Sequence, residues 1–429
     1  MGILIVLATL FLCFAVGMPI AYGLGLAALA GAWWTGIPPA AVMLQISSGV
    51  SKFAMLTIPF FVLAGAIMAE GGMARRLVAL ANALVGLVRI RGGLSVVNVL
   101  ATTFLSGISG SAVADTSAIG SVMIPQMEAS GYPRVFATNV TITSSVQALL
   151  VPPSHNAVIY SLATGGTISV ISLFMAGVMP GLLLGFAIIL LCLVMAYRDG
   201  HPQGEAVPLR ATLKIMFEAM WGLITIVIII GGILGGVFTA VEAGAVACVW
   251  AFGVTMFIYR DYRWRDLPVL VHRTLRTVAM VMTLIAFAAG VGYMMALMQM
   301  PAKITAFFLT LSHNKYVILM LINVMLLLLG CFMDMAPSIL ICTPILLPVM
   351  MNFGVDPVHF GIIMMLNLGI GLCHPPVGSI IFVGCAVGKV RMEQVVREIW
   401  PFYAVMFVVL MLVTYVPAIS LWLPHALHL

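Results

Sequence analysis

Polar side chains interrupt a very apolar sequence at a few positions, and these positions could carry chemistry. In the first half they lie in SGISGSAVADTS and directly after the pair Pro152-Pro153. In the second half they lie in GCFMDMAPS and around a second Pro-Pro pair. The candidates are Ser109, Ser111, Asp115, Thr116, Ser154, His155 and Asn156 in the first half, and Asp334, Ser338, His374, Gly378 and Ser379 in the second.

These residue types indicate ion binding. Adjacent prolines end a helix, and a broken helix leaves free carbonyls and free amides inside the apolar segment. Carbonyl, hydroxyl and carboxylate oxygens are hard ligands that suit a cation such as Na⁺, whereas helix N-termini attract anionic groups. We therefore assign every candidate except His155 to two Na⁺ sites, one in each half. A substrate is expected to contact Ser109, Ser154, His155 and Asn156.

A structural interpretation remains open for the same residues. Asp115 and Asp334 could cap the second helix of a hairpin. His155 and His374 could be hydrogen-bonded at helix ends, and serines also mediate helix packing. Because a carboxylate inside a membrane is costly, both acids remain functional candidates by default.

Enzyme chemistry is not indicated. Neither Asp115 nor Asp334 lies in a GxGD motif, the sequence has no HExxH, and GISGS does not match GxSxG. Glu242, another acid in an apolar stretch, is expected to hydrogen-bond Thr239 near the outer surface. The sequence therefore predicts neither an enzyme nor an organic cofactor.

The composition predicts a membrane protein. Of the 429 residues, 63% are hydrophobic and only 7% are charged, whereas a soluble protein needs far more charge on its surface. Apolar runs of about 20 residues recur from end to end, as expected for a polytopic all-α fold in a lipid bilayer. The net charge of +6 reflects arginine-rich loops and does not imply nucleic acid.

Two arginine-rich loops predict the topology. Residues 198–214 and 260–276 are separated by two apolar segments, about 216–239 and 241–259, that return the chain to the same side. Cytoplasmic loops carry an excess of Lys and Arg, so both loops are predicted to be cytoplasmic. A last span at 401–424 would then place the C-terminus in the periplasm.

Several landmarks recur at an offset of 223 residues, which indicates an internal repeat. The pairs are Pro125 with Pro348, Gly131 with Gly354, Pro152 with Pro375 and Pro153 with Pro376. Each repeat is expected to hold a span, an interfacial arm, a hairpin with a polar tip and a helix broken at Pro-Pro. The apolar runs beside the tips have about 12 to 16 residues, too few to cross a core of about 30 Å, so the hairpins are predicted to be re-entrant.

The predicted repeats are inverted, because an odd number of crossings separates their arms and the first arm carries more arginine. Inverted repeats with discontinuous helices are typical of secondary transporters. The predicted division is a scaffold at 1–56, a first repeat at 57–197 (tip 106–117, break 152–153), cytoplasmic loops around a two-helix scaffold hairpin at 198–276, a second repeat at 277–400 (tip 330–338, break 375–376) and a C-terminal span at 401–429.

Three stretches resemble one family. GGLSVVNVLATTFLSGISGSAVADTSAIGSVMIPQM, VPPSHNAVIY and GGVFTAVEAGAVA are similar to the large membrane subunit of TRAP (tripartite ATP-independent periplasmic) transporters. The resemblance covers essentially the whole chain. Many members read SSxxGPxIPPS before the first break, whereas this chain reads SSVQALLVPPSHN, so His155 and Asn156 are where substrate preference is expected to differ.

The resemblance implies a function and partners. It implies an elevator-type transporter of the ion transporter superfamily in the bacterial inner membrane, with Na⁺ as coupling ion and an organic acid as substrate. It also implies a small four-helix membrane subunit and a periplasmic substrate-binding protein. The alternative is a self-sufficient cation–carboxylate symporter of the same superfamily, which would need neither partner.

Overall fold

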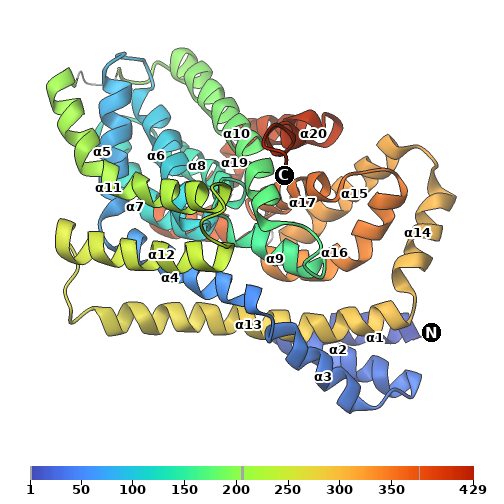
Figure 1. Ribbon diagram of the computed structural model, residues 1–429. Coiled ribbons are helices and arrows are strands. Elements are labelled where there is room, and N and C mark those ends of the chain that lie inside the picture. The colour runs from blue at the N-terminus through green and yellow to red at the C-terminus, as the bar shows by residue number, and fades with distance from the viewer. Residues whose placement is uncertain (1, 204–206, 376) are drawn as a thin grey trace.

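The computed structural model describes residues 2–203, 207–375 and 377–429 (Figure 1), so Pro376 of the second predicted break and residues 204–206 of a predicted loop lie outside it. The first helices are α1 (Gly2–Ala15), α2 (Ile20–Thr35), α3 (Pro39–Val50), α4 (Thr57–Glu70), α5 (Met73–Gly86), α6 (Gly93–Ser109), α7 (Ala112–Ala129), α8 (Arg134–Ser144), α9 (His155–Ala163) and α10 (Val170–Asp199). The others are α11 (Leu209–Leu234), α12 (Ala240–Gly253), α13 (Leu267–Leu297), α14 (Met300–Leu311), α15 (Lys315–Phe332), α16 (Met335–Asn352), α17 (Pro357–Gly371), α18 (Ser379–Gly388), α19 (Met392–Glu398), α20 (Trp400–Tyr415) and α21 (Ala418–Ala426).

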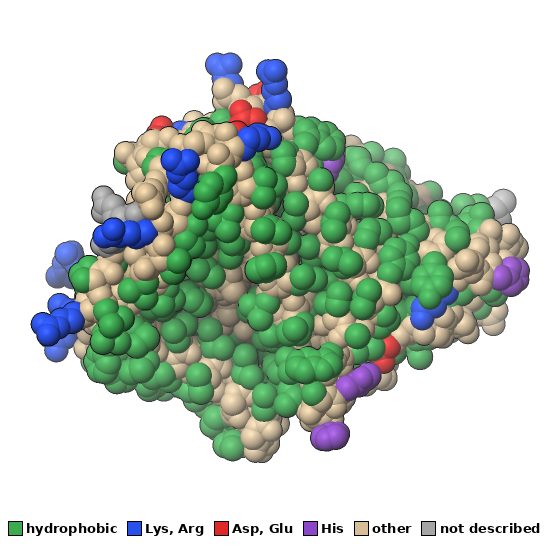
Figure 2. Space-filling view, turned by 90° about the horizontal axis from the view of Figure 1, so that it is seen from above, with side chains coloured by type: hydrophobic (Ala, Val, Ile, Leu, Met, Phe, Trp, Pro, Cys, Tyr) green, Lys and Arg blue, Asp and Glu red, His purple; other side chains and the backbone are tan. Residues whose placement is uncertain are grey.

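The helices have the length and surface of a membrane protein. Within the described ranges, seven helices are long and apolar enough to cross a bilayer, or up to eight if the bent pair α19–α20 forms one span. Figure 2 shows hydrophobic side chains over most of one face, with Lys and Arg gathered mainly toward its left and upper rim. A bilayer can solvate such an apolar surface, which water cannot. The predicted all-α polytopic membrane fold is confirmed.

The long helix α13 organises one side of the molecule. It packs against α2, α3 and α4, and α12 packs in turn against α4 and α11. In Figure 1, α13 runs below the central helices and α1–α3 lie along its lower right. The hairpin α6–α7, the hairpin α15–α16 and the broken helices lie above α13 in this view.

Both hairpins have longer arms and narrower tips than the sequence predicted. The arms α6, α7, α15 and α16 have 17, 18, 18 and 18 residues, which is about 27 Å for 18 residues. Only Gly110 and Ser111 separate α6 from α7, and only Met333 and Asp334 separate α15 from α16. Polar residues near the first tip remain helical because they hydrogen-bond one another, so their polarity does not end the helix. The re-entrant path of the hairpins stays a prediction.

The predicted polar loops are also shorter, and the predicted last span is interrupted. The chain is non-helical between α10 and α11 and between η3 (Val254–Tyr259), a π-helical turn, and α13, but α13 already begins at Leu267. α20 ends at Tyr415 and α21 begins at Ala418. Val416, which precedes a proline, has φ −118° and ψ 83°, because Pro417 excludes a helical conformation of the residue before it.

Glu242 closes the N-terminus of α12, as the sequence predicted. Its Oε2 accepts hydrogen bonds from the backbone N–H and the hydroxyl of Thr239, both at 2.8 Å. The Thr239 hydroxyl accepts in return from the Glu242 N–H at 3.3 Å. This reciprocal pair is a capping box, which satisfies two amides that the helix cannot bond internally.

Close packing of α10 requires a glycine. A Cβ on Gly177 would overlap the carbonyl oxygen of Leu150, which lies just before the first helix break. A Cβ on Gly292, in contrast, would meet nothing within 4 Å. Small residues of this kind let membrane helices approach one another closely.

We expect Gly177→Ala to destabilise the purified protein by about 1–3 kcal/mol, because α10 must move away from Leu150. Gly292→Ala is the matched control, and it should be neutral or slightly stabilising since alanine favours a helix by about 1 kcal/mol over glycine. Thermal unfolding in detergent measures both. An unchanged Tm for Gly177→Ala would contradict this packing.

Candidate functional site

The tip of the first hairpin lies against the first helix break. Gly110 has φ +61°, a conformation that residues with a side chain rarely adopt. A Cβ on Gly110 would lie 2.6 Å from the carbonyl oxygen of Pro153 and 3.3 Å from the backbone nitrogen of His155. Ser111 caps α7, since its hydroxyl accepts from the N–H of Ala114 at 3.4 Å. The local sequence therefore brings the two predicted polar segments together.

Asp115 is a buried carboxylate beside this tip. It lies in the first turn of α7 and has no exposed surface. It accepts hydrogen bonds from the hydroxyl of Ser106, at 2.8 Å, and from the hydroxyl of Ser109. None of the four ion pairs among the described residues involves Asp115. Buried charges need compensation, so this carboxylate favours a cation or a proton as partner. Asp115 is not the helix cap, because Ser111 holds that position.

Other predicted ligands of the first half are held by their own backbone. The Thr116 hydroxyl donates to the carbonyl of Ala112 at 2.8 Å within α7. The Ser154 hydroxyl donates to the carbonyl of Leu149, also at 2.8 Å, and so bridges the helix break. His155 begins α9 and is half-buried, whereas Asn156 is buried. Ser154, His155 and Asn156 thus lie together on the α9 side of the break.

A row of buried polar groups joins α6 to the first broken helix. The Asn98 amide donates to the hydroxyl of Thr141 at 2.8 Å. Next along α6, the Thr103 hydroxyl donates to Oε1 of Gln147 at 2.7 Å. These residues were missed as site residues. On the same helix, the Thr102 hydroxyl accepts from Ser144 at 3.3 Å. The spacing of Asn98, Thr102 and Ser106, four residues apart on one helical face, is a sequence signal that could have revealed Asn98 and Thr102. Thr103 lies outside this pattern.

The second hairpin meets the second break in a similar way. The N–H of Val377 donates to the carbonyl of Cys331, near the end of α15, at 3.2 Å. A Cβ on Gly330 would lie 3.0 Å from the carbonyl oxygen of Leu368. The hydroxyl oxygen of Ser379 is buried, and no described residue hydrogen-bonds it. With Gly378 directly before it, Ser379 is a predicted ligand that the fold leaves available.

His374 is engaged in packing. Its ring stacks on Tyr403, with centroids 4.7 Å apart and an angle of 21° between the planes. Its Nδ1 lies 3.1 Å from the carbonyl oxygen of Pro375. Tyr403, whose hydroxyl donates to the carbonyl of Cys373, was also missed. These contacts favour the structural interpretation of His374, a hydrogen-bonded histidine at a helix end.

The carboxylates occupy different positions in the two halves. The offset of 223 residues relates Ser111 to Asp334 and Asp115 to Ser338. Asp334 takes the N-cap position of α16, is exposed and makes no side-chain cap hydrogen bond. Ser338 is buried, and its hydroxyl donates to the carbonyl of Asp334 at 2.9 Å. The buried acid of the first half is therefore replaced by a hydroxyl in the second.

Each hairpin also contacts the broken helix of the other half. α7 packs against α18, and α16 packs against α9. In both cases it is the second arm of a hairpin that meets the part of a broken helix after its break. A Cβ on Gly120 of α7 would lie 3.2 Å from Val387 of α18. The two candidate sites are thus parts of one packed body.

Comparison with known proteins identifies the family. Residues 7–419 match the family model of the tripartite ATP-independent periplasmic transporter DctM component. The chain is 38% identical to the C4-dicarboxylate TRAP transporter large permease protein DctM of Rhodobacter capsulatus, with 100% of each chain covered. It is 43% identical to the protein YgiK of Salmonella typhimurium, over 98% of this chain and 97% of that protein.

A longer relative and a solved structure extend the comparison. The chain is 38% identical to the isethionate TRAP transporter permease protein DctMQ of Oleidesulfovibrio alaskensis, over 95% of this chain and 64% of that protein. The YdaH transporter of Alcanivorax borkumensis shares the fold, with a TM-score of 0.60, 15% identity and 86% of each chain covered. Because the family model spans nearly all of this chain, the chain belongs to the DctM family and is a multi-pass TRAP transporter large permease subunit, not an enzyme.

Proposed function

We propose that this subunit imports a small organic acid and that Na⁺ is the coupling ion. The observation that carries the proposal is Asp115, a fully buried carboxylate held by two serine hydroxyls at a hairpin tip. Removing a charge from water costs several kcal/mol or more unless a partner compensates it. A Na⁺ ion that binds and leaves during transport would supply that compensation in one state and withdraw it in another.

The first Na⁺ site would use Asp115 and Ser109, with carbonyl oxygens of the break at Pro153 nearby. Ser111, Thr116, Ser154 and Asn156 would complete or line it. The second site would use Ser338, Gly378 and Ser379. The Ser379 hydroxyl is buried and bonds none of the described residues, which supports a ligand role. Asp334 and His374 would lie at its edge, because Asp334 is exposed and His374 stacks on Tyr403.

The substrate is proposed to be a carboxylate or another small organic anion. The names of relatives mention C4-dicarboxylate, isethionate and sialic acid, which are all anions. The N-terminus of α9, which begins at His155, offers free amides and a positive dipole end beside the first tip. Ser109, Ser154, His155 and Asn156 would contact the anion there.

Movement is proposed to follow an elevator mechanism. The body formed by the hairpins and the broken helices would move against a scaffold that contains α1–α3, α11 and α12. The mutual packing of α7 on α18 and of α16 on α9 supports a unit that moves as one. We also propose that the repeats at 57–197 and 277–400 are inverted, and that the C-terminus is periplasmic.

Two partners are proposed: a small four-helix membrane subunit and a periplasmic substrate-binding protein. The chain covers only 64% of the DctMQ relative, so that protein has room for an additional part. A self-sufficient symporter is the alternative. Uptake by this chain alone in liposomes would favour the alternative, whereas uptake that requires both partners supports the TRAP assembly.

Na⁺ coupling is tested first by ion replacement. Liposomes that contain this chain, the small subunit and the loaded binding protein should take up the organic acid when a Na⁺ gradient is applied. We expect replacement of Na⁺ by choline to lower the initial rate of organic acid uptake about tenfold or more. A change of this size is usual when the binding of one ligand is coupled to the binding of another. Unchanged uptake in choline would exclude Na⁺ coupling.

Asp115→Asn should weaken Na⁺ binding and leave the fold intact, because the amide oxygen can still accept from Ser106. We expect the Na⁺ concentration for half-maximal uptake to rise about tenfold or more, since one formal charge leaves a buried site. Glu128→Gln on the same helix is the control, because Glu128 is exposed and pairs with Arg134. If wild type and both variants need the same Na⁺ concentration for half-maximal uptake, Asp115 is not part of the ion site.

Asp334→Ala should reduce uptake with little loss of folded protein. The side chain is exposed and makes no cap hydrogen bond, so its removal costs the helix little. Uptake rate and Tm are measured on the same preparation. Wild-type uptake by this variant would leave Asp334 as a structural residue at the start of α16.

A further inference from the structure

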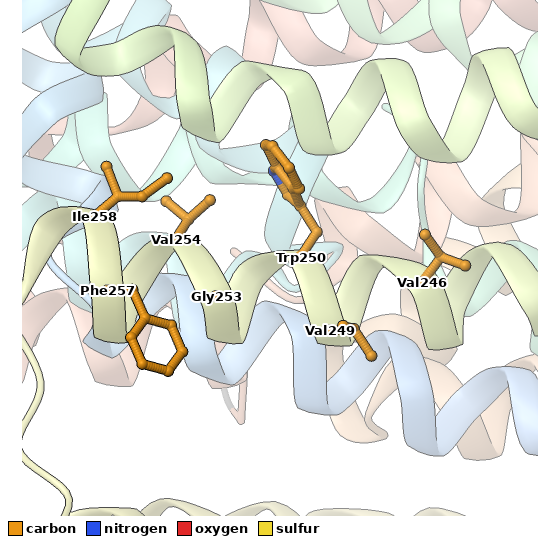
Figure 3. A pocket seen from close by; sticks show the side chains of 7 residues that line it. All are labelled: Val246, Val249, Trp250, Gly253, Val254, Phe257 and Ile258. Carbon is orange, nitrogen blue, oxygen red and sulfur yellow. The ribbon is translucent and has the colours of Figure 1, made fainter.

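An apolar groove lies along the second half of α12 and the π-helical turn η3 that follows it (Figure 3). Its volume is about 390 Å³, and its lining residues are Val246, Val249, Trp250, Gly253, Val254, Phe257 and Ile258. Figure 3 shows side chains on both sides of Gly253, which itself leaves a notch. A Cβ on Gly253 would meet nothing within 4 Å. The groove therefore offers an elongated, fully apolar surface.

An aromatic cluster closes one end of this groove. The ring of Phe257, which lines the groove, lies 6.3 Å from the ring of Trp264. Phe252 lies 5.8 Å from Trp264 and 6.4 Å from Phe257. Trp264 belongs to the short connection before α13 and is 62% exposed. Exposed tryptophans at helix ends are typical of the level of lipid headgroups in a membrane.

Positive charge gathers at the same end. Arg260 lies two residues after Ile258, the last residue of the groove, and Arg263 and Arg265 flank Trp264. All three are exposed, and none takes part in the four ion pairs of the described chain. Of the acids around this end, Asp261 pairs with Arg76 and Glu70 pairs with Arg273. Asp266 and Glu218 take part in no ion pair among the described residues, so two free acids face the three arginines. The end of the groove is thus positively charged.

We propose that the groove holds an acyl chain of an anionic phospholipid whose phosphate binds Arg260, Arg263 and Arg265. The site combines an apolar groove, a tryptophan at headgroup level and three guanidinium groups that have no carboxylate partner among the described residues. These features match the tail, the interface and the phosphate of one molecule. A transmembrane helix of a protein partner would cover the apolar surface but would leave the three charges without a counterpart.

The bound lipid would hold the connection between α12 and α13. These helices belong to the region in which α13 packs on α2, α3 and α4 and α12 packs on α4 and α11. An anionic lipid at the junction would fix the depth of this region in the bilayer while other parts of the protein move. The inference depends on the family assignment only for the membrane location, and it does not depend on which ion or substrate is carried.

Native mass spectrometry of the purified chain tests the headgroup. The protein is incubated with equal amounts of phosphatidylglycerol and phosphatidylcholine with identical acyl chains. We expect wild type to retain phosphatidylglycerol in preference to phosphatidylcholine. The variant Arg260→Gln/Arg263→Gln/Arg265→Gln should lose this preference, because each arginine raises the affinity for the anionic headgroup about fivefold. The control removes three other exposed arginines and has the same change in charge: Arg75→Gln/Arg210→Gln/Arg397→Gln.

The groove itself is tested by filling its notch. Gly253→Leu should lower retention of both lipids, whereas Gly292→Leu, a second helical glycine with free space, should not. The rise in Tm on adding phosphatidylglycerol should be smaller in Gly253→Leu and in the triple arginine variant but not in the two controls, and the Tm without lipid verifies folding. Equal retention of the two lipids by wild type, or an unchanged preference in the arginine variant, would overturn the proposal. Loss of phosphatidylglycerol on adding the small membrane subunit would show that a protein fills the groove instead.

Discussion

A helix can break inside a membrane only if other groups cover the backbone that the break exposes, and the rest of this structure depends on that constraint. At the first break, the cover is the tip of the first hairpin, where Gly110 meets the carbonyl of Pro153. At the second break, the end of α15 covers the exposed backbone, because the carbonyl of Cys331 accepts a hydrogen bond from the N–H of Val377. Each break therefore needs a hairpin, and each hairpin needs small residues at its closest approach.

The same backbone plan carries different chemistry in the two halves. One half buries a carboxylate at Asp115, and the other places a hydroxyl at the corresponding Ser338 and moves its acid to the exposed Asp334. A buried carboxylate demands a compensating charge, whereas a buried hydroxyl does not. Under the proposed function, the two ion sites would therefore differ in affinity, and the first would respond more strongly to the presence of its ion.

Buried polar links connect each hairpin to its broken helix. Asn98 donates to Thr141 in the first half, and Asn367 donates to Asn323 at 2.7 Å in the second. Hydrogen bonds of this kind fix the register of helices that apolar packing alone would allow to slide. These hydrogen bonds position each hairpin tip against its helix break. They therefore support the site without contacting it.

Much of the fold could be predicted from the sequence. Apolar length, proline pairs and arginine-rich segments predicted the membrane class, the first break and most helices, because a bilayer imposes these patterns residue by residue. Glu242 was predicted correctly since a capping box is local. The hairpin tips are narrower than predicted, because polar residues such as Ser106 can remain helical when a neighbour accepts their hydrogen bonds. The interruption of the last predicted span at Val416 was missed, although Pro417 excludes a helical conformation there.

The sequence by itself determined which groups are available: a carboxylate at Asp115, hydroxyls around it and a broken helix beyond Pro153. Only the tertiary structure decided which of them meet. It left Asp334 exposed, stacked His374 on Tyr403 and gave the Ser379 hydroxyl no hydrogen-bond partner among the described residues. The physical reason is that composition and spacing act along the chain, whereas burial and hydrogen-bond partners come from separate segments that pack together only in the folded protein. Gly110 and Pro153 are 43 residues apart, and Gly120 and Val387 are 267 residues apart.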